Sequence, residues 1–384
     1  MKRLTSLNTE AKCILLLSLL AFAQAITHFG VVYDDSKNYF SATRFIEGWR
    51  PDLVKPSAVS LAARPLLPVV VIPFDLVFGL PIAYGIVNTI FWVLSAILLF
   101  LLVKKLTGSL SSSLYASFLL STTWPMVLYG AASMTEAIGL FFTLLTVYLT
   151  LSLPERKLNK PKLLLLGLIV GLGALSREVV LAAFMSAFII LMYRKDYHSI
   201  IWWFIPALCV IFFYQVYAHF SFGVNYLTHY LSAGIEHTTR RGMLSTWLDP
   251  VWIGKAFLIG HAPLAALTLI LGFLEEKRRE VLVIFYMLFI PAFACFVIWP
   301  FHDLRLAVML YHATMPLAGI GFEALIKSLS SKPILNFIPV RLWALLLISL
   351  NLIFADWWTY AKWGQLSLPW DIYFFAHWGD LRPP

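Results

Sequence analysis

Long apolar runs separated by short polar loops dominate the pattern of this chain. A helix needs about 20 mainly apolar residues to cross the hydrocarbon core of a bilayer, and most of the runs reach or approach that length. They lie at residues 13–32, 66–80, 82–103, 110–130, 137–153, 163–181, 182–193, 199–218, 251–273, 281–298, 306–326 and 341–355. The pattern predicts an all-α integral membrane protein with about eleven transmembrane helices, in which residues 1–384 form a single polytopic membrane domain.

Two of the runs are ambiguous. The run at 66–80 contains two prolines, which favour a re-entrant segment or a merger with the run at 82–103. The run at 182–193 is short, and it counts as a span if Arg177 and Glu178 mark its outer edge.

Clustered basic residues predict the orientation. Pairs and triplets such as Lys104-Lys105, Arg194-Lys195 and Lys277-Arg278-Arg279 fall in alternate loops, on the side of the N-terminus. By the positive-inside rule this side is cytoplasmic, and the C-terminus then lies outside. Cleavage of the N-terminal run as a signal peptide after Ala25 is an alternative that leaves the outer side unchanged.

The expected outer side carries the three longest polar segments. The first outer loop, at 33–64, contains an acidic motif and is expected to form interfacial helices. The outer loop at 219–250 is a candidate lid, and residues 356–384 form an outer, Trp-rich C-terminal tail.

Composition agrees with a membrane protein and excludes other classes. Only 13% of the residues are charged and 60% are hydrophobic, with a mean hydropathy of +0.81, whereas soluble domains carry about 25% charged residues. The net charge of +9 lies in short clusters between apolar runs, which is typical of topology signals, so we expect no nucleic-acid partner. The three cysteines lie in apolar segments and offer neither a disulfide framework nor metal-ligand spacing.

Charged and titratable residues gather at the outer boundaries of the spans, although a charge at membrane depth costs at least about 2.5–3.5 kcal/mol. These residues are Asp34, Asp35, Arg64, Glu136, Arg177, Glu178, His302, Asp303 and Arg305. Folded together, they would line one polar cavity that opens outward and borders lipid.

The carboxylates are candidates for acid–base chemistry. Asp34 or Asp35 could take a proton from an acceptor hydroxyl or hold a metal ion, while its neighbour tunes it. A solvated loop or a helix N-cap is the alternative for this pair. Glu136 could act on the acceptor or the metal, or could simply begin a helix, where an acid is favourable.

Two arginines are candidates for binding a phosphate, because a guanidinium presents a rigid fork to phosphate oxygens. Arg64 stands where the chain re-enters the membrane, and snorkelling to headgroups is its alternative role. Arg177 could face the phosphate, or it could be neutralised by its neighbour Glu178.

A late motif combines a histidine, an acid and an arginine. Asp303 could orient His302 or pair with Arg305, and Arg305 could meet a donor phosphate; a local salt bridge of little consequence is the alternative. In the outer loop, His229, His237, Arg240 and Arg241 could form a mobile lid or belong to a segment without chemistry.

The order of these motifs resembles that of the GT-C class of polytopic glycosyltransferases, which use a polyprenyl-phosphate sugar donor. The similarity is greatest to the branch related to protein O-mannosyltransferases and aminoarabinose transferases. The motifs that carry the resemblance are, in order, Asp34-Asp35, Arg64-Pro65-Leu66-Leu67-Pro68, Thr135-Glu136-Ala137, Gly171-Leu172-Gly173-Ala174-Leu175-Ser176-Arg177 and His302-Asp303-Leu304-Arg305.

The resemblance implies an inverting transfer of a sugar, such as mannose, from a polyprenyl or dolichyl phosphate to a glycan, lipid or protein acceptor. It implies Asp34 or Asp35 as the general base, with Asp34 preferred. The donor phosphate would meet Arg64, Arg177 and the motif of His302, Asp303 and Arg305. No cofactor is certain, and a divalent metal ion at Asp34, Asp35 and Glu136 stays open.

The implied site faces the outside of the plasma membrane in a prokaryote or the lumen of the endoplasmic reticulum in a eukaryote. Two other functions fit the same residues. A transporter or flippase of a lipid-linked saccharide would use the acidic pair as a gate, and a non-catalytic subunit of a glycosylation complex would need a partner for activity.

Overall fold

The computed structural model describes residues 9–25, 29–153, 160–242, 249–298, 303–331 and 339–363, and every regular element within them is a helix. The all-α prediction is thereby confirmed. The elements are α1 (Thr9–Ala25), α2 (Asp34–Ile46), η3 (Pro51–Leu53), α3 (Val54–Ala63), α4 (Leu66–Phe78), α5 (Leu80–Thr107), α6 (Leu110–Ser121), α7 (Trp124–Tyr129), α8 (Glu136–Ser152), α9 (Lys160–Ala174), α10 (Val179–Tyr193), α11 (Tyr197–Phe222), α12 (Tyr226–Arg241), α14 (Pro250–Lys255), η4 (Ala256–Gly260), α15 (Pro263–Glu275), α16 (Arg279–Ile298), η5 (Leu304–Leu310), α17 (Tyr311–Ser331) and α18 (Val340–Trp363).

Helix length and composition support a multi-pass membrane protein. Within the described residues, α5, α11 and α16 are each long and apolar enough to cross a bilayer alone. Two bent pairs would raise this number to five if each were one span. Since several of the remaining apolar helices are shorter than 18 residues, the count of eleven spans and the orientation of the termini stay predictions.

Several expected spans are broken in the structure. The run at 110–130 divides into α6 and α7, and the run at 251–273 bends by 98° between η4 and α15. In both cases a proline stands in the first turn of the next helix, Pro125 in α7 and Pro263 in α15. The first turn is where a helix tolerates proline, because the missing N–H would have no partner there, so each proline marks the start of a new helix.

The expected run at 66–80 forms α4, which does not merge with its successor. Gly79, at a φ of +83°, separates α4 from α5. Residues Pro51–Ala63 and Leu66–Phe78 instead form a pair bent by 119°, which agrees with the re-entrant alternative. The first outer loop is helical, as expected, and α18 continues past residue 355; residues 364–384 of the expected tail lie outside the described residues.

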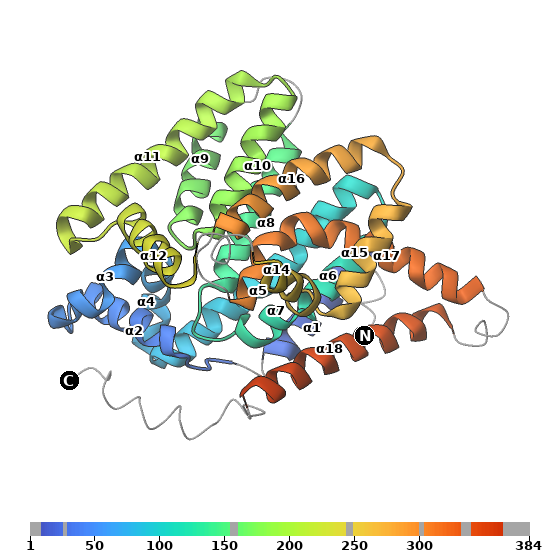
Figure 1. The fold of residues 1–384 in the computed structure, drawn as a ribbon, viewed down its shortest axis with the longest axis horizontal. Coiled ribbons are helices and arrows are strands. Elements are labelled where there is room, and N and C mark those ends of the chain that lie inside the picture. The colour runs from blue at the N-terminus through green and yellow to red at the C-terminus, as the bar shows by residue number, and fades with distance from the viewer. Residues whose placement is uncertain are drawn as a thin grey trace.

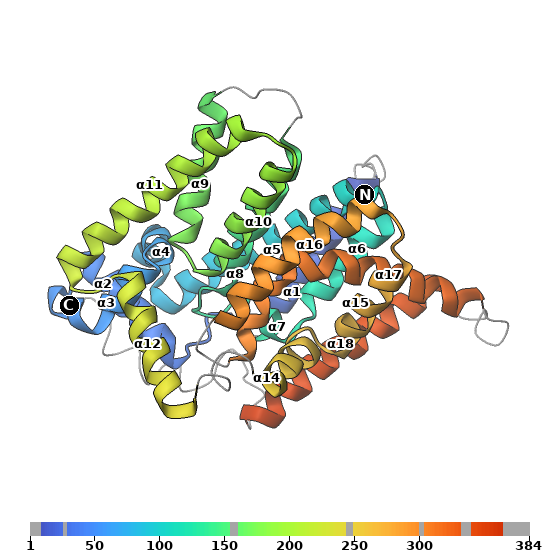
Figure 2. The same cartoon turned by 45° about the horizontal axis from the view of Figure 1, so that its top comes forward.

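The arrangement of the helices brings the outer-loop elements to one end of the molecule. Helices α2, α3 and α12 lie together beside α4, whereas α15, α17 and α18 lie at the far end (Figures 1 and 2). Between them, α5 packs against α8, and α8 packs against α10. The fold therefore places the acidic first loop next to the candidate lid.

Helices α15 and α17 pack in close contact. A Cβ atom built on Gly321 would lie 1.9 Å from the carbonyl oxygen of Thr268, and one on Gly272 would lie 1.8 Å from that of Leu317. Small residues at such crossings let two backbones touch, which is a main source of helix association inside a bilayer.

We expect Gly321→Ala to force α15 and α17 apart and to cost about 1–3 kcal/mol, as overpacking does. Thermal unfolding in detergent measures this loss. Gly254→Ala is the matched control, because a Cβ on Gly254 would meet nothing within 4 Å. Equal melting of the two variants would contradict the close contact.

Candidate functional site

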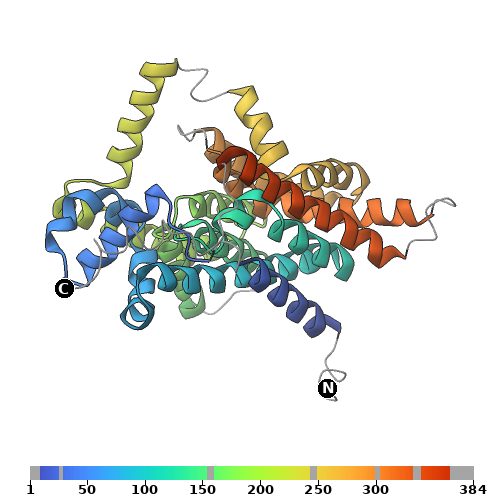
Figure 3. The ribbon, with the colours of Figure 1, turned by 90° about the horizontal axis from the view of Figure 1, so that it is seen from below.

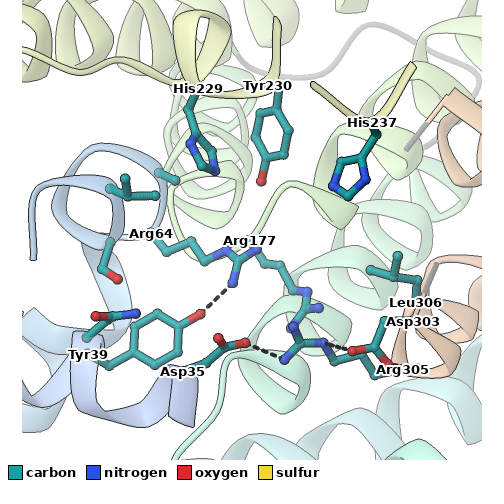
Figure 4. A pocket seen from close by; sticks show the side chains of 14 residues that line it. Asp35, Tyr39, Arg64, Arg177, His229, Tyr230, His237, Asp303, Arg305 and Leu306 are labelled. Atoms are coloured by element: carbon teal, nitrogen blue, oxygen red, sulfur yellow. Dashed lines mark hydrogen bonds and ion pairs between the residues drawn. The ribbon is translucent and has the colours of Figure 1, made fainter. Parts of the chain in front are cut away.

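One cavity of about 400 Å³ collects residues from distant parts of the chain (Figure 4). It lies where α2 and α3 meet α12, the turn before α10 and the start of η5. Its lining residues are Asp35, Asn38, Tyr39, Val59, Ser60, Ala63, Arg64, Arg177, His229, Tyr230, His237, Asp303, Arg305 and Leu306.

Most of the candidate residues meet at this cavity. Five of them line it directly: Asp35, Arg64, Arg177, Asp303 and Arg305. Glu136 lies behind the wall, in contact with two of the arginines. His302 and the side chain of Asp34 lie outside the described residues. The candidate charged residues whose side chains the structure describes therefore lie together at one site.

The acidic pair begins a helix without capping it. Helix α2 starts at Asp34, and its N-cap is Tyr33, whose backbone N–H donates to the Ser36 hydroxyl at 2.9 Å. The N-cap alternative for the two aspartates is therefore wrong. Both stand in the first helical turn, where the positive end of the helix dipole favours acids.

A buried, irregular segment at 130–135 carries the chain into Glu136. Its backbone groups need partners, because unpaired polar groups are costly away from water. Two backbone hydrogen bonds of 2.9 and 3.0 Å join it to residues 30–31. The side-chain amide of Asn88, on α5, donates to two of its carbonyl groups at 2.5 and 2.8 Å. The segment is thus held between the residues that precede α2 and the long helix α5.

Arg305 lies at the centre of the charged groups. Its Nη1 atom lies 2.7 Å from Asp35 Oδ2, and its Nε atom lies 2.9 Å from Asp303 Oδ2 (Figure 4). The same Nε atom is 3.9 Å from Glu136 Oε1. Of the two sequence alternatives for Asp303, pairing with Arg305 is the one observed. Three carboxylates from three elements thus surround one guanidinium.

Arg177 and Glu136 form a second, fully buried pair. Arg177 Nη1 lies 2.6 Å from Glu136 Oε1 and donates to the Thr135 hydroxyl at 2.9 Å. The side chains are 2% and 0% exposed, so each charge depends on the other for compensation. Gly139 on α8 makes room for this pair, because a Cβ there would lie 2.8 Å from that of Arg177.

Arg64 pairs with Glu178 across 114 positions of sequence. Its Nη2 and Nε atoms lie 2.5 and 2.9 Å from the two carboxylate oxygens, and its Nη1 atom donates to the Tyr39 hydroxyl. This fork-to-fork geometry is the strong form of an arginine–carboxylate pair. The alternative that Arg177 and Glu178 neutralise each other is wrong, since each is engaged by a distant partner.

The arginines change the acidity of Asp35. Burial raises the pKa of its carboxyl, but the attraction of Arg305, Arg64 and Arg177 outweighs burial, so the pKa lies below its usual range. Asp35 is therefore ionised at neutral pH. On α12, burial and Arg64 lower the pKa of His229, which leaves a neutral imidazole that can both donate and accept a hydrogen bond.

Sequence reasoning missed several groups of the site. Asn38 and Tyr39 follow Asp35 by three and four positions and therefore share its helical face; this spacing could have revealed them. Tyr230, over Arg64 and Arg177 in Figure 4, carried no such signal. The role of Asn88 depends on backbone geometry, which no sequence pattern shows.

A second buried ion cluster holds α2 on α4. Arg44 Nη1 lies 2.5 Å from Asp75 Oδ2 and 2.7 Å from Glu47 Oε2. Arg44 is in the last turn of α2 and Glu47 is its C-cap, so the cluster fixes the end of the helix that carries Asp35. Within the described part of the chain, no group of three or more His, Cys, Asp or Glu side chains could hold a metal ion.

Comparisons with known proteins agree with this arrangement. Residues 79–221 match the family described as dolichyl-phosphate-mannose-protein mannosyltransferase. No curated protein matches the sequence. Two crystal structures of ArnT from Cupriavidus metallidurans share the fold: one bound to undecaprenyl phosphate (12% identity, TM-score 0.55) and one in the apo state (11% identity, TM-score 0.56).

Each of these alignments covers 97% of this chain and 75% of the ArnT chain. The likeness to ArnT shows that the two proteins have the same fold. The family match covers residues 79–221, which is less than half of the chain. Both findings agree with the GT-C class of membrane glycosyltransferases that the order of the motifs resembles.

Proposed function

We propose that this enzyme transfers a sugar, a hexose such as mannose, from a polyprenyl or dolichyl phosphate to an acceptor hydroxyl, with inversion at the anomeric carbon. The observation that carries the proposal is the contact of 2.7 Å between the Asp35 carboxylate and the Arg305 guanidinium on the wall of one cavity. A base and a phosphate-binding cation thus stand within the length of one sugar.

Asp35 is the base in this proposal, because its carboxylate lines the cavity and contacts Arg305. Its carboxylate takes the proton of the acceptor hydroxyl as the hydroxyl oxygen bonds to the anomeric carbon. The bond between that carbon and the phosphate oxygen breaks, and the polyprenyl phosphate leaves with the electron pair. Asp34, preferred from the sequence, remains the alternative base.

The arginines stabilise the leaving phosphate. Negative charge grows on its oxygens as the bond breaks, so fixed cations there favour the transition state over the ground state. Arg305 is the first candidate, since it touches Asp35 directly. Arg64 and Arg177 line the same cavity, and Glu136 acts behind them by positioning Arg177 and Arg305.

Donor binding and base strength are coupled through Arg305. Its contact with Asp35 lowers the pKa of that carboxyl and so weakens it as a base. A phosphate that takes over the N–H groups of Arg305 would release the carboxylate and raise its pKa. The base would become effective only when the donor is in place.

The family match supports mannose and a dolichyl phosphate, and the undecaprenyl phosphate in one ArnT structure supports a polyprenyl carrier. The positive-inside pattern supports a site on the outer or lumenal side, in the plasma membrane of a prokaryote or the endoplasmic reticulum of a eukaryote. A glycan, lipid or protein supplies the acceptor hydroxyl.

Asp35→Asn removes the base but keeps the size of the side chain. We expect transfer from a polyprenyl-phosphate sugar to fall by about 10²–10⁴-fold, the usual contribution of a general base, with an unchanged melting temperature. Asp34→Asn is the matched control. Loss of transfer in Asp34→Asn together with full activity in Asp35→Asn would assign the base to Asp34.

The pH dependence of kcat/KM tests the link between Asp35 and Arg305. Because the pKa of Asp35 is lowered, its carboxylate persists as the pH falls, and activity is lost only below the ordinary range of an aspartate. Arg305→Gln removes the main cation that lowers the pKa of Asp35. The acidic limb of the pH–rate profile, measured in single turnovers, should therefore move to higher pH. The control is Arg50→Gln, whose pair with Asp52 lies outside the cavity; an unmoved limb in Arg305→Gln would disprove the coupling.

Glu136→Ala should lower the stability of the folded protein and not only the rate of transfer. The change leaves Arg177 buried without its carboxylate, which costs about 3–5 kcal/mol. Asp52→Asn breaks an exposed pair and should leave the melting temperature in detergent unchanged. A stable, inactive Glu136→Ala enzyme would favour a direct catalytic role for Glu136.

A further inference from the structure

Helix α12 has three different surfaces around its axis. Its N-terminus is fixed by Asn225, whose side chain accepts a hydrogen bond from the Thr228 N–H at 2.8 Å. One surface carries His229, Tyr230 and His237, which line the cavity above Arg64 and Arg177 (Figure 4).

The second surface is an apolar stripe that faces away from the protein. Leu227, Leu231 and Ile235 follow one another at four-residue spacing, and they are 66%, 56% and 67% exposed. Residues with this spacing lie one above the other on a helix. Large apolar side chains exposed in a row mark a surface that another apolar phase covers.

The third surface is polar. Thr228, Ser232, Glu236, Thr239 and Arg240 are all exposed, and Glu236 pairs with Arg240 at 2.8 Å on the outside of the helix. At 100° per residue, this surface lies between the apolar stripe and the cavity-lining surface. Helix α12 therefore has a cavity-lining face, an exposed polar face and an exposed apolar face around its axis.

The apolar stripe continues the exposed apolar surface of α11. Helix α11 is long and apolar enough to span the bilayer. Only 17% of the residues in its apolar 18-residue stretch are buried in the protein. Leu227 of the stripe lines a groove together with Phe212, Val216 and Phe220 of α11. The tie between the two helices is a hydrogen bond of 2.6 Å from the Tyr226 N–H to the Gln215 side chain.

The direction of α12 differs from that of the span before it. Gly223, at a φ of +70°, ends α11 and lets the chain turn. In Figure 1, α11 lies across the page while α12 is seen nearly end-on, and Figure 3 shows α12 standing out from the other helices. Helix α12 therefore does not continue the direction of α11.

We propose that α12 is a membrane-bound lid: Leu227, Leu231 and Ile235 lie in the outer leaflet at the boundary of headgroups and acyl chains. The polar surface faces water, and His229, Tyr230 and His237 close the cavity. The partner of the exposed stripe is the lipid bilayer itself. Three-surfaced helices of this kind bind at the interface through their apolar area.

This placement has a consequence for the substrate. A lipid-linked donor diffuses in the same leaflet as the stripe, so the lid holds the edge of the cavity at the depth of the donor phosphate. A substrate that reaches the site from water passes on the other side of the helix, over the polar surface.

Spin labels test the placement without an activity assay. Leu231→Cys and Ser232→Cys are each introduced into the full chain after Cys13, Cys209 and Cys295 have been replaced by alanine. The labelled proteins are placed in nanodiscs of phosphatidylethanolamine and phosphatidylglycerol. We expect the label at 231 to collide severalfold more with oxygen than with a water-soluble nickel chelate, and the label at 232 to show the reverse.

Equal access of the nickel chelate to both labels would overturn the proposal, because α12 would then stand in water. A label at 231 that is immobile and closed to both agents would also overturn it, in favour of a protein partner or a second copy of the chain. Neither result depends on the proposed transfer, so a failure of this placement is distinct from a failure of the proposed function.

A second test keeps the native cysteines. Leu231→Ser with Ile235→Ser removes apolar area from exposed positions, and Ser232→Ala with Thr239→Ala is the matched control on the polar surface. For Leu231→Ser with Ile235→Ser, we expect severalfold slower transfer from a polyprenyl-phosphate sugar in vesicles. The same variant should keep an unchanged rate in detergent with a short, water-soluble donor. The same loss of rate in vesicles and in detergent, or no loss in either, would contradict a lid that works through the bilayer.

Discussion

The structure depends on ion pairs between arginines and carboxylates, and the pairs Arg177–Glu136 and Arg64–Glu178 are largely withdrawn from water. A charge buried alone is too costly to keep, so each arginine of the cavity lies beside an acid from another element. Glu136 serves both Arg177 and Arg305, and Arg305 also holds Asp35. The contacts that gather α2, α8 and η5 into one site are therefore the same contacts that place its candidate catalytic groups.

This charge balance shapes how the enzyme would use its donor. Since Arg64, Arg177 and Arg305 are all paired within the described part of the chain, a phosphate has to share or displace carboxylates. Under the proposed mechanism, displacement of Asp35 is the productive case, because it frees a base beside the incoming anion. The pair with Arg305 would keep that base weak until the donor binds.

The sequence predicted the all-helical fold and most of the charged residues that meet at the cavity, because charges near a membrane are rare enough to be informative. It did not predict their partners. Arg177 and Glu178 are adjacent in the chain, yet they bond to Glu136 and Arg64, which depends on how helices pack at long range. Broken spans were equally hidden, since hydropathy measures length and polarity but not the bends at Pro125 and Pro263.

The central claim is that the donor phosphate takes Arg305 from Asp35. The most direct measurement is a cryo-electron microscopy structure in nanodiscs with a non-transferable phosphonate analogue of a polyprenyl-phosphate hexose. The account predicts phosphonate oxygens within hydrogen-bonding distance of Arg305, with Asp35 released and facing the anomeric carbon. A phosphonate bound away from Arg305, with the contact of 2.7 Å to Asp35 intact, would contradict it.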